Sequence, residues 1–345
     1  MGQLYYSPIS INSGQVPSTQ TDFPVLVSQT DTRFKTIGNG GHVNNSSGFD
    51  IRPYSDTGLT TALSYELERY NASTGEVIMW VKVASLSSST TPIYLGYGDT
   101  TLTTDGSSGS NTFSNNFSAV LHLKDGTTLS STDSTGSFTW NKINTPTATT
   151  GQIDGAMALA SASSQYLISS SNGPSATALT VSHWVKGTSF PNDYNSIFNR
   201  GTNLYGIYVK SNGKLFSIVK ATTSISYDGT GSNTLSTGTW YYLVLTYDST
   251  NGLKAYVNAG SDGTVAANGT ADVGAATTSI GRQDGTNSRF WNGAIDEARF
   301  ASVARSANWI TTEYNNQNAP GTFETLGTEV AVPSTDTGNF FMLFP

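Results

Sequence analysis

Alternating apolar and polar positions dominate the chain, and the clearest run of them spans residues 239–258. Successive side chains of a β-strand point to opposite faces, and residues 240–247 place apolar or aromatic side chains on both faces apart from one threonine. Such a strand is covered on both sides and belongs in the middle of a packed β layer. Residues 248–252 contain Asn-Gly and form a turn signal, after which the alternation resumes. The pattern predicts a central hairpin with Trp240 and Leu245 in the core.

The first hundred residues show the same alternation in shorter pieces. Apolar and polar side chains alternate within residues 63–71, 76–85 and 91–99, with turn residues between these segments. Short strands at this spacing are typical of a β-sandwich. Residues 100–116 are rich in Gly, Ser, Thr and Asn, which predicts a linker to a second domain.

The hairpin of residues 239–258 also carries a resemblance to a known family. The run GTWYYLVLTYDSTNGLKAYVN is similar to the central hairpin of laminin-G-like, concanavalin A-like jelly-roll modules. GQIDGAMALASASSQYLIS (151–169) resembles the entry strands of these modules, and ALTVSHWVKG (178–187) resembles their tryptophan strand. Residues 279–315 resemble the closing strands and the short final helix. The resemblance covers residues 117–327 and implies the fold but no single function, because this fold carries lectins, adhesion modules and glycosidases alike.

The first domain resembles a different family. The segments TDFPVLVS, GFDIRPYSDTG, LSYELERYN, EVIMWVKVAS and TPIYLGYGD follow one another in the order found in the family catalogued as domain of unknown function 2341. The resemblance covers residues 5–99. Members of that family often precede a laminin-G-like module in bacterial surface proteins and phage structural proteins. The resemblance therefore implies association with a surface and no known chemistry.

Together, the pattern and the two resemblances predict an all-β protein with two β-sandwich (jelly-roll) domains in tandem. A short helix is expected near the end of the second domain. The expected divisions are a first domain over residues 1–99, a linker over 100–116, a second domain over 117–327 and a C-terminal tail over 328–345.

Composition excludes several classes of function for this chain of 345 residues. The net charge is −7 and no basic cluster is present, so we expect no nucleic-acid partner. No apolar run is long enough to span a bilayer, so we expect no membrane insertion. The chain has 0 Cys, which removes disulfides, thiolate metal sites and thiol nucleophiles.

The carboxylates and histidines do not form a pattern typical of an enzyme. Glycoside hydrolysis needs two carboxylates at a fixed separation, one of them protonated. Glu66 and Glu68 share one face of a predicted strand, where we expect them to be solvated. Asp296 and Glu297 point to opposite faces of a strand and cannot act as a pair. No GxSxG nucleophile elbow accompanies the histidines, so we expect no enzymatic activity and structural roles for His42, His122 and His183.

Two loops of the second domain carry side chains suited to glycans. Sugar binding uses aromatic faces for C–H groups, and fork-shaped donors for hydroxyls and carboxylates. Residues 188–196 and 282–291 supply both kinds of group and have no packing periodicity. The candidate glycan-binding residues are Tyr194, Asn195, Arg282, Asn287 and Arg289. The tryptophans lie within strand patterns, and we expect a core position for Trp184, Trp240 and Trp291.

Nothing in the sequence requires a cofactor, and structural calcium is the ion that the resemblance implies. Calcium binds several carboxylate and carbonyl oxygens at a loop. Laminin-G-like relatives often hold one at the rim of the sandwich. The candidate ligands are Asp154, Asp284 and Asp296, with ordinary loop carboxylates as the alternative because no acidic cluster fixes a site.

The C-terminal end of the chain is unusually apolar. After a polar spacer, the sequence places large apolar side chains at Phe340, Phe341, Met342, Leu343 and Phe344. Exposed apolar patches generally mark contacts. We expect this tail to dock into another subunit of an assembly, which includes a second copy of the chain, or else to fold onto its own domain.

These observations favour a non-enzymatic surface protein. The first residues lack the basic and apolar regions of a secretory signal, and virion proteins assembled in the cytoplasm need none. We expect a virion structural or host-recognition protein, in a tail, fibre or head-decoration position, that binds cell-surface glycans through its second domain. The alternatives are a bacterial extracellular adhesin or carbohydrate-binding surface protein and, after it, a polysaccharide-active enzyme.

Overall fold

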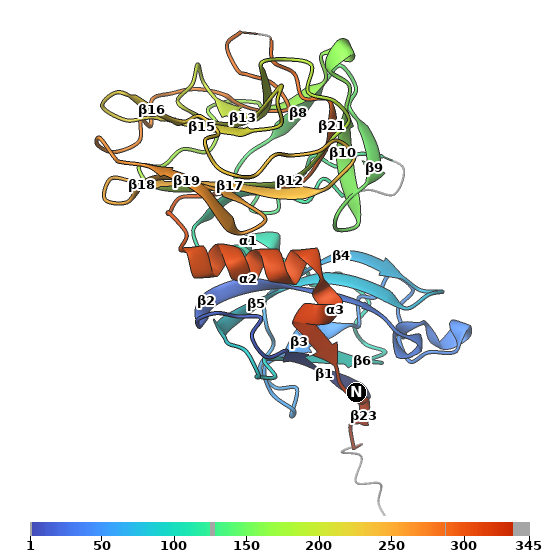
Figure 1. The fold of residues 1–345 in the computed structure, drawn as a ribbon. Coiled ribbons are helices and arrows are strands. Elements are labelled where there is room, and N and C mark those ends of the chain that lie inside the picture. Colours follow the sequence, from blue (N-terminus) through green and yellow to red (C-terminus); the bar gives the residue numbers. More distant parts are fainter. Residues whose placement is uncertain (1, 125–127, 287, 334–345) are drawn as a thin grey trace, which may run out of the picture. The chain divides into compact units, whose positions relative to one another are not determined.

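The computed structural model describes residues 2–124, 128–286 and 288–333 (Figure 1). These residues form two compact domains. The first contains the described residues up to Ser108 together with those from Ala319 onward, and the second runs from Gly109 to Asn318. Antiparallel sheets make up both domains, which confirms the predicted all-β fold. No helix in the described ranges is long and apolar enough to cross a membrane.

Two antiparallel sheets form the first domain. One contains β1 (Tyr5–Ile11), β3 (Arg52–Tyr54), β6 (Ile93–Tyr97), β22 (Glu324–Leu326) and β23 (Val330–Ala331). The other contains β2 (Gln20–Thr30), β4 (Tyr65–Asn71) and β5 (Glu76–Leu86). The helical turns of this domain are η1 (Thr32–Phe34), η2 (Ile37–Asn39) and α3 (Pro320–Phe323). Apolar side chains of both sheets are buried, among them Ile9, Val25 and Leu95.

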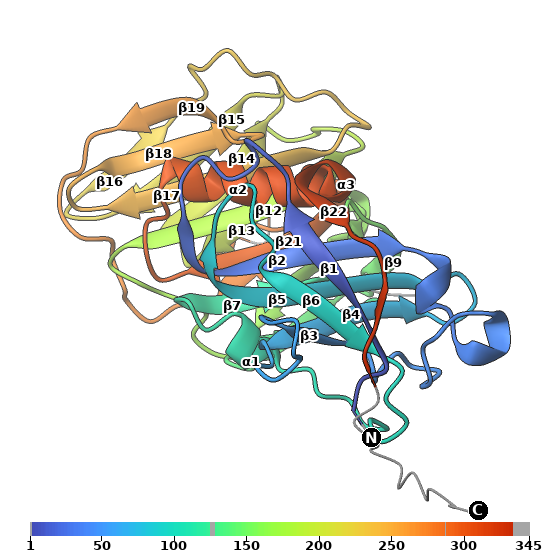
Figure 2. The same ribbon diagram turned by 90° about the horizontal axis from the view of Figure 1, so that it is seen from below.

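The chain returns to the first domain after completing the second. In Figure 2 the red strand β22 runs beside the dark blue β1, and the register pairs Ile9 with Leu326. β23 continues along β1, and Val332 N–H donates to the Leu4 carbonyl at 2.8 Å. An unpaired strand edge offers a row of free backbone donors and acceptors, and this segment satisfies them. Residues 319–333 thus belong to the first domain, whereas the expected boundaries put them in the second domain and the tail.

Part of the expected linker is hydrogen-bonded to the first domain. The Leu67 N–H donates to Ser107 Oγ at 3.0 Å, and the Ser108 N–H donates to the Tyr65 carbonyl at 2.8 Å. These bonds join the linker to β4. The second domain then begins with α1 (Gly109–Thr112). The serines of the linker therefore bind the β4 backbone through one hydroxyl and one backbone N–H group.

The second domain is a sandwich of two antiparallel sheets. The first of these, here called the helix-covered sheet, runs in the order β19 (Gly260–Val265), β18 (Gly252–Val257), β17 (Tyr241–Asp248), β12 (Leu179–Gly187), β21 (Gly293–Ala301), β10 (Gly155–Leu159) and β9 (Thr147–Thr150), with β7 (Phe117–Leu121) beside β21. The second, here called the open sheet, runs in the order β16 (Ser224–Tyr227), β15 (Leu215–Lys220), β14 (Tyr205–Lys210), β13 (Tyr194–Arg200), β20 (Thr278–Ile280), β11 (Tyr166–Ser169) and β8 (Trp140–Ile143). The remaining helical elements are η3 (Ser161–Ser163) and α2 (Ala307–Asn318).

Strand β17 is covered on both faces, as its sequence predicts. Leu243 and Leu245 belong to the core between the two sheets, and both are fully buried. Tyr242 and Val244 point the other way and pack against Ile310 of α2. Figure 1 shows α2 running across the outer face of this sheet. The second cover of the strand is therefore the short terminal helix, which supplies the layer that the two-faced apolar pattern requires.

The three tryptophans predicted to lie in the core occupy two kinds of position. Trp184 and Trp291 are buried, which confirms the prediction for these two residues. Trp240 is only partly buried, and the prediction of a core position was wrong. The reason is local, because β17 begins one residue later at Tyr241 and Trp240 packs at the edge of the cluster beneath α2. The Lys186 ammonium lies 4.9 Å from the Trp240 ring centroid.

Candidate functional site

Three aromatic side chains gather on the outer face of the open sheet. Tyr194 begins β13, Tyr208 lies in β14 and Phe216 lies in β15. The strand pairing places Tyr208 directly opposite Phe216. Phe216 lies 4.8 Å from Tyr194 and 5.6 Å from Tyr208 between ring centroids, and both pairs meet edge to face. We call Tyr194, Tyr208 and Phe216 the aromatic platform.

The pleat of the strands explains why these rings face outward. On β14, Ile207 and Val209 enter the core between the sheets, so Tyr208 between them points away from it. On β15, Leu215 points into the core and the next side chain points out. Tyr208 is nevertheless buried beneath its neighbours, while Tyr194 and Phe216 remain partly exposed. The accessible surface of the aromatic platform therefore comes from two rings supported by a third.

Two cations border the aromatic platform. The Arg289 guanidinium carbon lies 4.8 Å from the Tyr194 ring centroid, and the Lys210 ammonium lies 5.7 Å from the same centroid. Lys210 is held by Asp228, with 2.9 Å between the ammonium and the carboxylate oxygen. Tyr194 and Arg289 come from the two loops that the sequence marks as candidates, and the fold brings them together. The Ser196 N–H joins these loops by donating to the Arg289 carbonyl at 2.8 Å.

The other glycan candidates have different positions. Asn195 is fully buried, and its amide donates to the carbonyls of Asn192 at 2.8 Å and Val209 at 2.9 Å. It therefore shapes the first loop from inside. Asn287 lies outside the described residues. Arg282 is buried and held by Asp284.

Arg282 stabilises the second loop through a compact group of contacts. Its guanidinium stacks over the Tyr166 ring at 4.1 Å from the centroid and donates to the Tyr166 hydroxyl at 3.0 Å. It also forms an ion pair with Asp284 at 2.9 Å, and the Thr277 hydroxyl donates to the same carboxylate at 2.7 Å. Arg282 and Asp284 thus satisfy one another inside the loop, and the guanidinium is committed to neighbours within the chain.

The three aspartates proposed for calcium do not form one cluster in the described part of the chain. Asp284 accepts from Arg282, as described above. Asp296 accepts from the backbone N–H groups of Gln152 and Ile153, both at 2.9 Å. Its carboxylate closes the turn that contains Asp154. Calcium binding stays a prediction for these residues.

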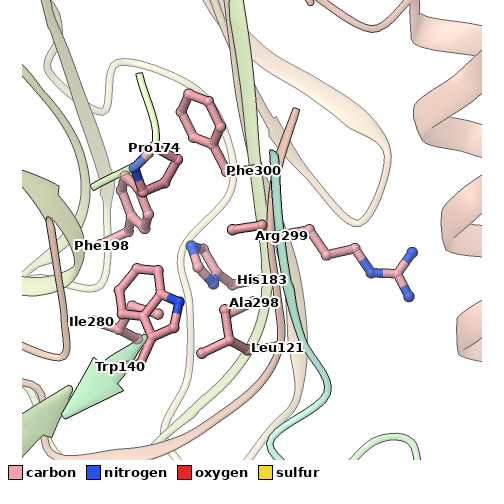
Figure 3. A pocket seen from close by; sticks show the side chains of 10 residues that line it. Leu121, Trp140, Pro174, His183, Phe198, Ile280, Ala298, Arg299 and Phe300 are labelled. Carbon is pink, nitrogen blue, oxygen red and sulfur yellow. The ribbon is translucent and has the colours of Figure 1, made fainter. Parts of the chain in front are cut away.

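His183 lies in the middle of the sandwich core. It lines a small cavity of about 10 Å³ together with Trp140, Phe198 and Phe300 (Figure 3). Neither ring nitrogen of His183 has a hydrogen-bond partner among the described residues, and burial lowers its pKa to about 3. The cavity has room for about one water molecule and for no larger ligand. His183 is therefore a neutral core side chain at ordinary pH.

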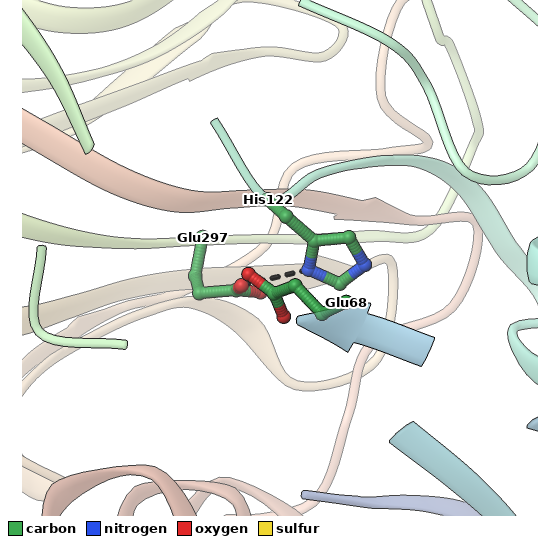
Figure 4. Close-up of side chains that lie close together, drawn as sticks. All are labelled: Glu68, His122 and Glu297. Atoms are coloured by element: carbon green, nitrogen blue, oxygen red, sulfur yellow. Dashed lines mark hydrogen bonds and ion pairs between the residues drawn. The ribbon is translucent and has the colours of Figure 1, made fainter. Parts of the chain in front are cut away.

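A buried charge network joins the helix-covered sheet to α2. His122 lies 2.7 Å from Glu297, nitrogen to oxygen (Figure 4), and Arg299 donates to the other oxygen of Glu297 at 2.6 Å. Arg299 also donates to Glu313 on α2 at 2.8 Å, and the Tyr242 hydroxyl donates to Glu313 at 2.7 Å. Burial alone would raise the pKa of Glu297, but the charges of His122 and Arg299 outweigh burial and hold that pKa below its usual range.

The remaining carboxylates and histidine have partners of their own. Glu68 accepts from the Trp80 indole at 2.6 Å, so the expectation of a solvated side chain was wrong for this residue. His42 pairs with Glu329 at 2.8 Å in the first domain. Asp296 and Glu297 bind different partners, but the register shift opposite Ser182 and Trp184 breaks the strict alternation of faces on which their prediction rested.

A polar cleft of about 280 Å³ lies beside β17 and β18 of the helix-covered sheet. Its lining includes Asp248, Asn251, Lys254 and Arg305. Its one aromatic lining residue, Tyr256, is buried and belongs to the cluster beneath α2. The Asp248 carboxylate is already occupied by the backbone N–H groups of its own turn, at 2.8 and 2.6 Å. This cleft lacks the partly exposed rings that distinguish the aromatic platform.

Sequence reasoning missed three members of the site, namely Tyr208, Lys210 and Phe216. The signal for them is present in YGIYVK (205–210) and LFSIVK (215–220), where the core positions alternate with an aromatic or a cationic side chain. Alternation marks these residues as facing away from the core. It does not show that they lie beside Tyr194, because that requires the order of strands in the sheet.

Two family models match the chain. The model of the concanavalin A-like lectin/glucanases superfamily matches residues 160–311, and that of the domain of unknown function 2341 matches residues 47–143. Both matches confirm the resemblances seen in the sequence. No curated protein matches the chain.

Several solved structures are similar to part of the chain. Domain 4 of an extracellular GH43 arabinanase from Geobacillus stearothermophilus, in complex with arabinotriose, is 21% identical with a TM-score of 0.45, over 56% of this chain and 96% of that one. The receptor-binding domain of botulinum neurotoxin mosaic serotype C/D is 16% identical with a TM-score of 0.47, over 59% of this chain and 51% of that one. A SAP-like pentraxin from Limulus polyphemus is 21% identical with a TM-score of 0.34, over 42% of this chain and 73% of that one. The chain thus spans about half of the neurotoxin domain.

The resemblance of each domain to a family rests on the two family-model matches together with the sheets themselves. A core packed between two antiparallel sheets is what a concanavalin A-like module requires. The second domain therefore resembles the concanavalin A-like lectin/glucanases superfamily, and the first domain resembles the domain of unknown function 2341.

Proposed function

We propose that the second domain is a non-catalytic glycan-binding module and that the aromatic platform is its binding surface. The observation that carries the proposal is the juxtaposition of two partly exposed rings, Tyr194 and Phe216, with the Arg289 guanidinium. Sugar rings present C–H groups that pack on aromatic surfaces, while their hydroxyls need polar partners at the edge of those surfaces. The aromatic platform offers both within one area of a rigid sheet.

Rigidity supports the same function. Tyr208 is fixed beneath the two exposed rings, because the Asn199 amide donates to its hydroxyl at 2.6 Å and the hydroxyl donates to Asn203 at 3.2 Å. A surface that is ordered before binding loses less conformational entropy when it binds. Residues on strands also hold a position more precisely than residues on loops.

Binding to a glycan array tests the proposal. The double variant Tyr194→Ala with Phe216→Ala is expected to lose the hits of the wild-type protein, because both accessible rings are removed. Val273→Ala is the matched control, since it also removes an exposed apolar side chain from the same domain. Unchanged hits in the double variant, with an unchanged melting temperature, would place the binding surface elsewhere.

We further propose that the protein works at a virion surface, with a bacterial surface adhesin or carbohydrate-binding surface protein as the alternative. The tandem arrangement of the two families supports a surface role, since the resemblance of the first domain implies one. The neighbouring genes distinguish the two, because capsid and tail genes alongside favour a virion protein. A polysaccharide-active enzyme would instead show turnover on a polysaccharide panel. We expect no turnover.

The apolar tail remains a candidate docking segment. Phe340 to Phe344 lie outside the described residues, so the proposal rests on the sequence alone. Deletion of residues 336–345 is expected to leave the melting temperature almost unchanged, because β22 and β23 precede the deletion. The deletion is expected to abolish incorporation into the particle or oligomer. Normal assembly of the truncated protein, measured by light scattering or particle composition, would contradict docking.

A further inference from the structure

We propose that the aromatic platform selects acidic saccharides and that Arg289 receives the carboxylate of the sugar. This inference rests on the proposed glycan binding and names the class of glycan. It starts from a difference between Arg289 and three other cations of the open sheet and its loops, Lys210, Lys214 and Arg282. Arg289 makes no ion pair or side-chain hydrogen bond with any described residue, and its contact is the face of Tyr194.

The neighbouring cations are already neutralised or bonded. Lys210 pairs with Asp228 at 2.9 Å, and Arg282 pairs with Asp284 at 2.9 Å. The Lys214 ammonium donates to backbone carbonyls, including that of Gly231 at 3.1 Å. The chain as a whole has a net charge of −7, which disfavours the approach of an anion on average. A partly exposed guanidinium without a carboxylate partner is therefore the position on this face best suited to an anionic group.

The backbone at Arg289 is held in a conformation that costs free energy. Its φ angle is 57°, in the left-handed region that favours glycine. The conformation is maintained by the Ser196 N–H, which donates to the Arg289 carbonyl at 2.8 Å. The next carbonyl, that of Phe290, accepts from the Asn192 amide at 3.2 Å. Non-glycine residues held in this region concentrate at functional sites, and the residue in this conformation here carries the guanidinium that lies over the Tyr194 ring.

Guanidinium chemistry points to a carboxylate. The planar group presents parallel N–H donors that match the two oxygens of a carboxylate, and its charge is present at all physiological pH values. The Arg289 guanidinium lies over the Tyr194 ring, and this contact leaves its N–H donors available to a carboxylate. Phe216 lies beside Tyr194 and offers an apolar surface for the sugar ring that carries the carboxylate. Uronic acids and other carboxylated sugars combine these two features.

Calorimetric titration with three matched probes tests the inference. The probes are an oligosaccharide of uronic acids, the same oligosaccharide with its carboxyl groups reduced to alcohols, and a sulfated neutral oligosaccharide of equal length. The uronic form is expected to bind at least about tenfold more tightly than the other two, and Arg289→Gln is expected to remove this preference. Lys254→Gln is the matched control, because it removes one positive charge from the other sheet of the same domain.

Each alternative outcome has a separate meaning. Equal affinity for the uronic and the reduced forms would overturn the inference and leave glycan binding intact. Equal affinity for the sulfated form would show a general anion site and would overturn carboxylate selection. Retention of the preference by Arg289→Gln would move the anion site away from Arg289. Absence of binding to all three probes and to a glycan array would contradict the proposed function itself.

Discussion

The two outer faces of the second domain differ in what covers them. On the helix-covered sheet, α2 packs Ile310 against Tyr242 and Val244, and the charged groups beneath the helix pair with one another. On the open sheet, Figure 1 shows no described helix of this domain, and rings and a guanidinium remain partly exposed. Both faces use aromatic side chains at alternate strand positions. Burial and charge pairing therefore distinguish the structural face from the candidate binding face.

The two faces also differ in the partners of their arginine side chains. Arg299 is buried between Glu297 and Glu313, and these carboxylates raise its pKa against the effect of burial. Arg289 lies over the Tyr194 ring and forms no ion pair with any described carboxylate. A buried charge must be compensated by an opposite charge inside the protein, whereas an exposed charge is solvated and stays available to bind a ligand. The same residue type thus has a structural role on one face and a proposed binding role on the other.

The largest expected effect comes from breaking the covered face. Glu313→Ala is expected to lower the free energy of unfolding by about 3–5 kcal/mol, because it removes one of the two carboxylates that bind the buried Arg299 guanidinium and also removes the acceptor of the Tyr242 hydroxyl. Asp228→Ala, which breaks the exposed pair with Lys210, is expected to cost less than about 1 kcal/mol. Urea unfolding measures both. Equal losses in the two variants would mean that the network beneath α2 is no more important than a surface ion pair.

The next effect concerns the core that both sheets share. Leu245 is fully buried in that core, and Leu245→Ala is expected to cost about 2–5 kcal/mol through lost burial and the cavity left behind. The measurement is the urea midpoint at constant slope. A midpoint equal to that of the wild-type protein would show that the inward assignment of this position is wrong.

A pH-dependent effect follows from His183 in the same core. Its pKa is lowered to about 3 in the folded protein, so below pH 6.5 the unfolded chain binds a proton that the folded chain does not. The free energy of unfolding is therefore unaffected by His183 above pH 6.5 and falls as the pH drops from 6.5 towards 3. The expected decrease between pH 6.5 and 5 is about 2 kcal/mol. His183→Leu is expected to remove this part of the dependence, measured as urea unfolding at both pH values. Identical dependence in the variant and the wild-type protein would contradict the assignment.

The smallest expected effect is on the open face. Arg289→Gln is expected to change the free energy of unfolding by less than about 0.5 kcal/mol, because the side chain is partly exposed and makes no described ion pair. The same variant is the one expected to lose acidic-glycan selection. A loss of stability comparable to that of Glu313→Ala would show that Arg289 holds the fold together, and the contrast between the two faces would fail.

Much of the fold was determined by local sequence patterns. Alternation and the Asn251-Gly252 turn predicted the hairpin of β17 and β18, and Leu245 occupies the core position expected for it. Strand periodicity has this power because a side chain's face follows from its position alone. Two of the glycan candidates, Tyr194 and Arg289, also came from the sequence, where both were expected in loops without periodicity, but the structure places Tyr194 at the start of β13.

Other features were decided only by the tertiary structure. Periodicity assigns each side chain to a face, but strand order decides that Tyr208 and Phe216 stand beside Tyr194. Local composition did not reveal that the amide of Asn195 turns inward to bond carbonyls of its own loop and of β14. The return of residues 319–333 to β1 is a pairing between chain ends, which no local pattern encodes. These features depend on contacts between residues far apart in the chain, and such contacts exist only once the sheets have formed.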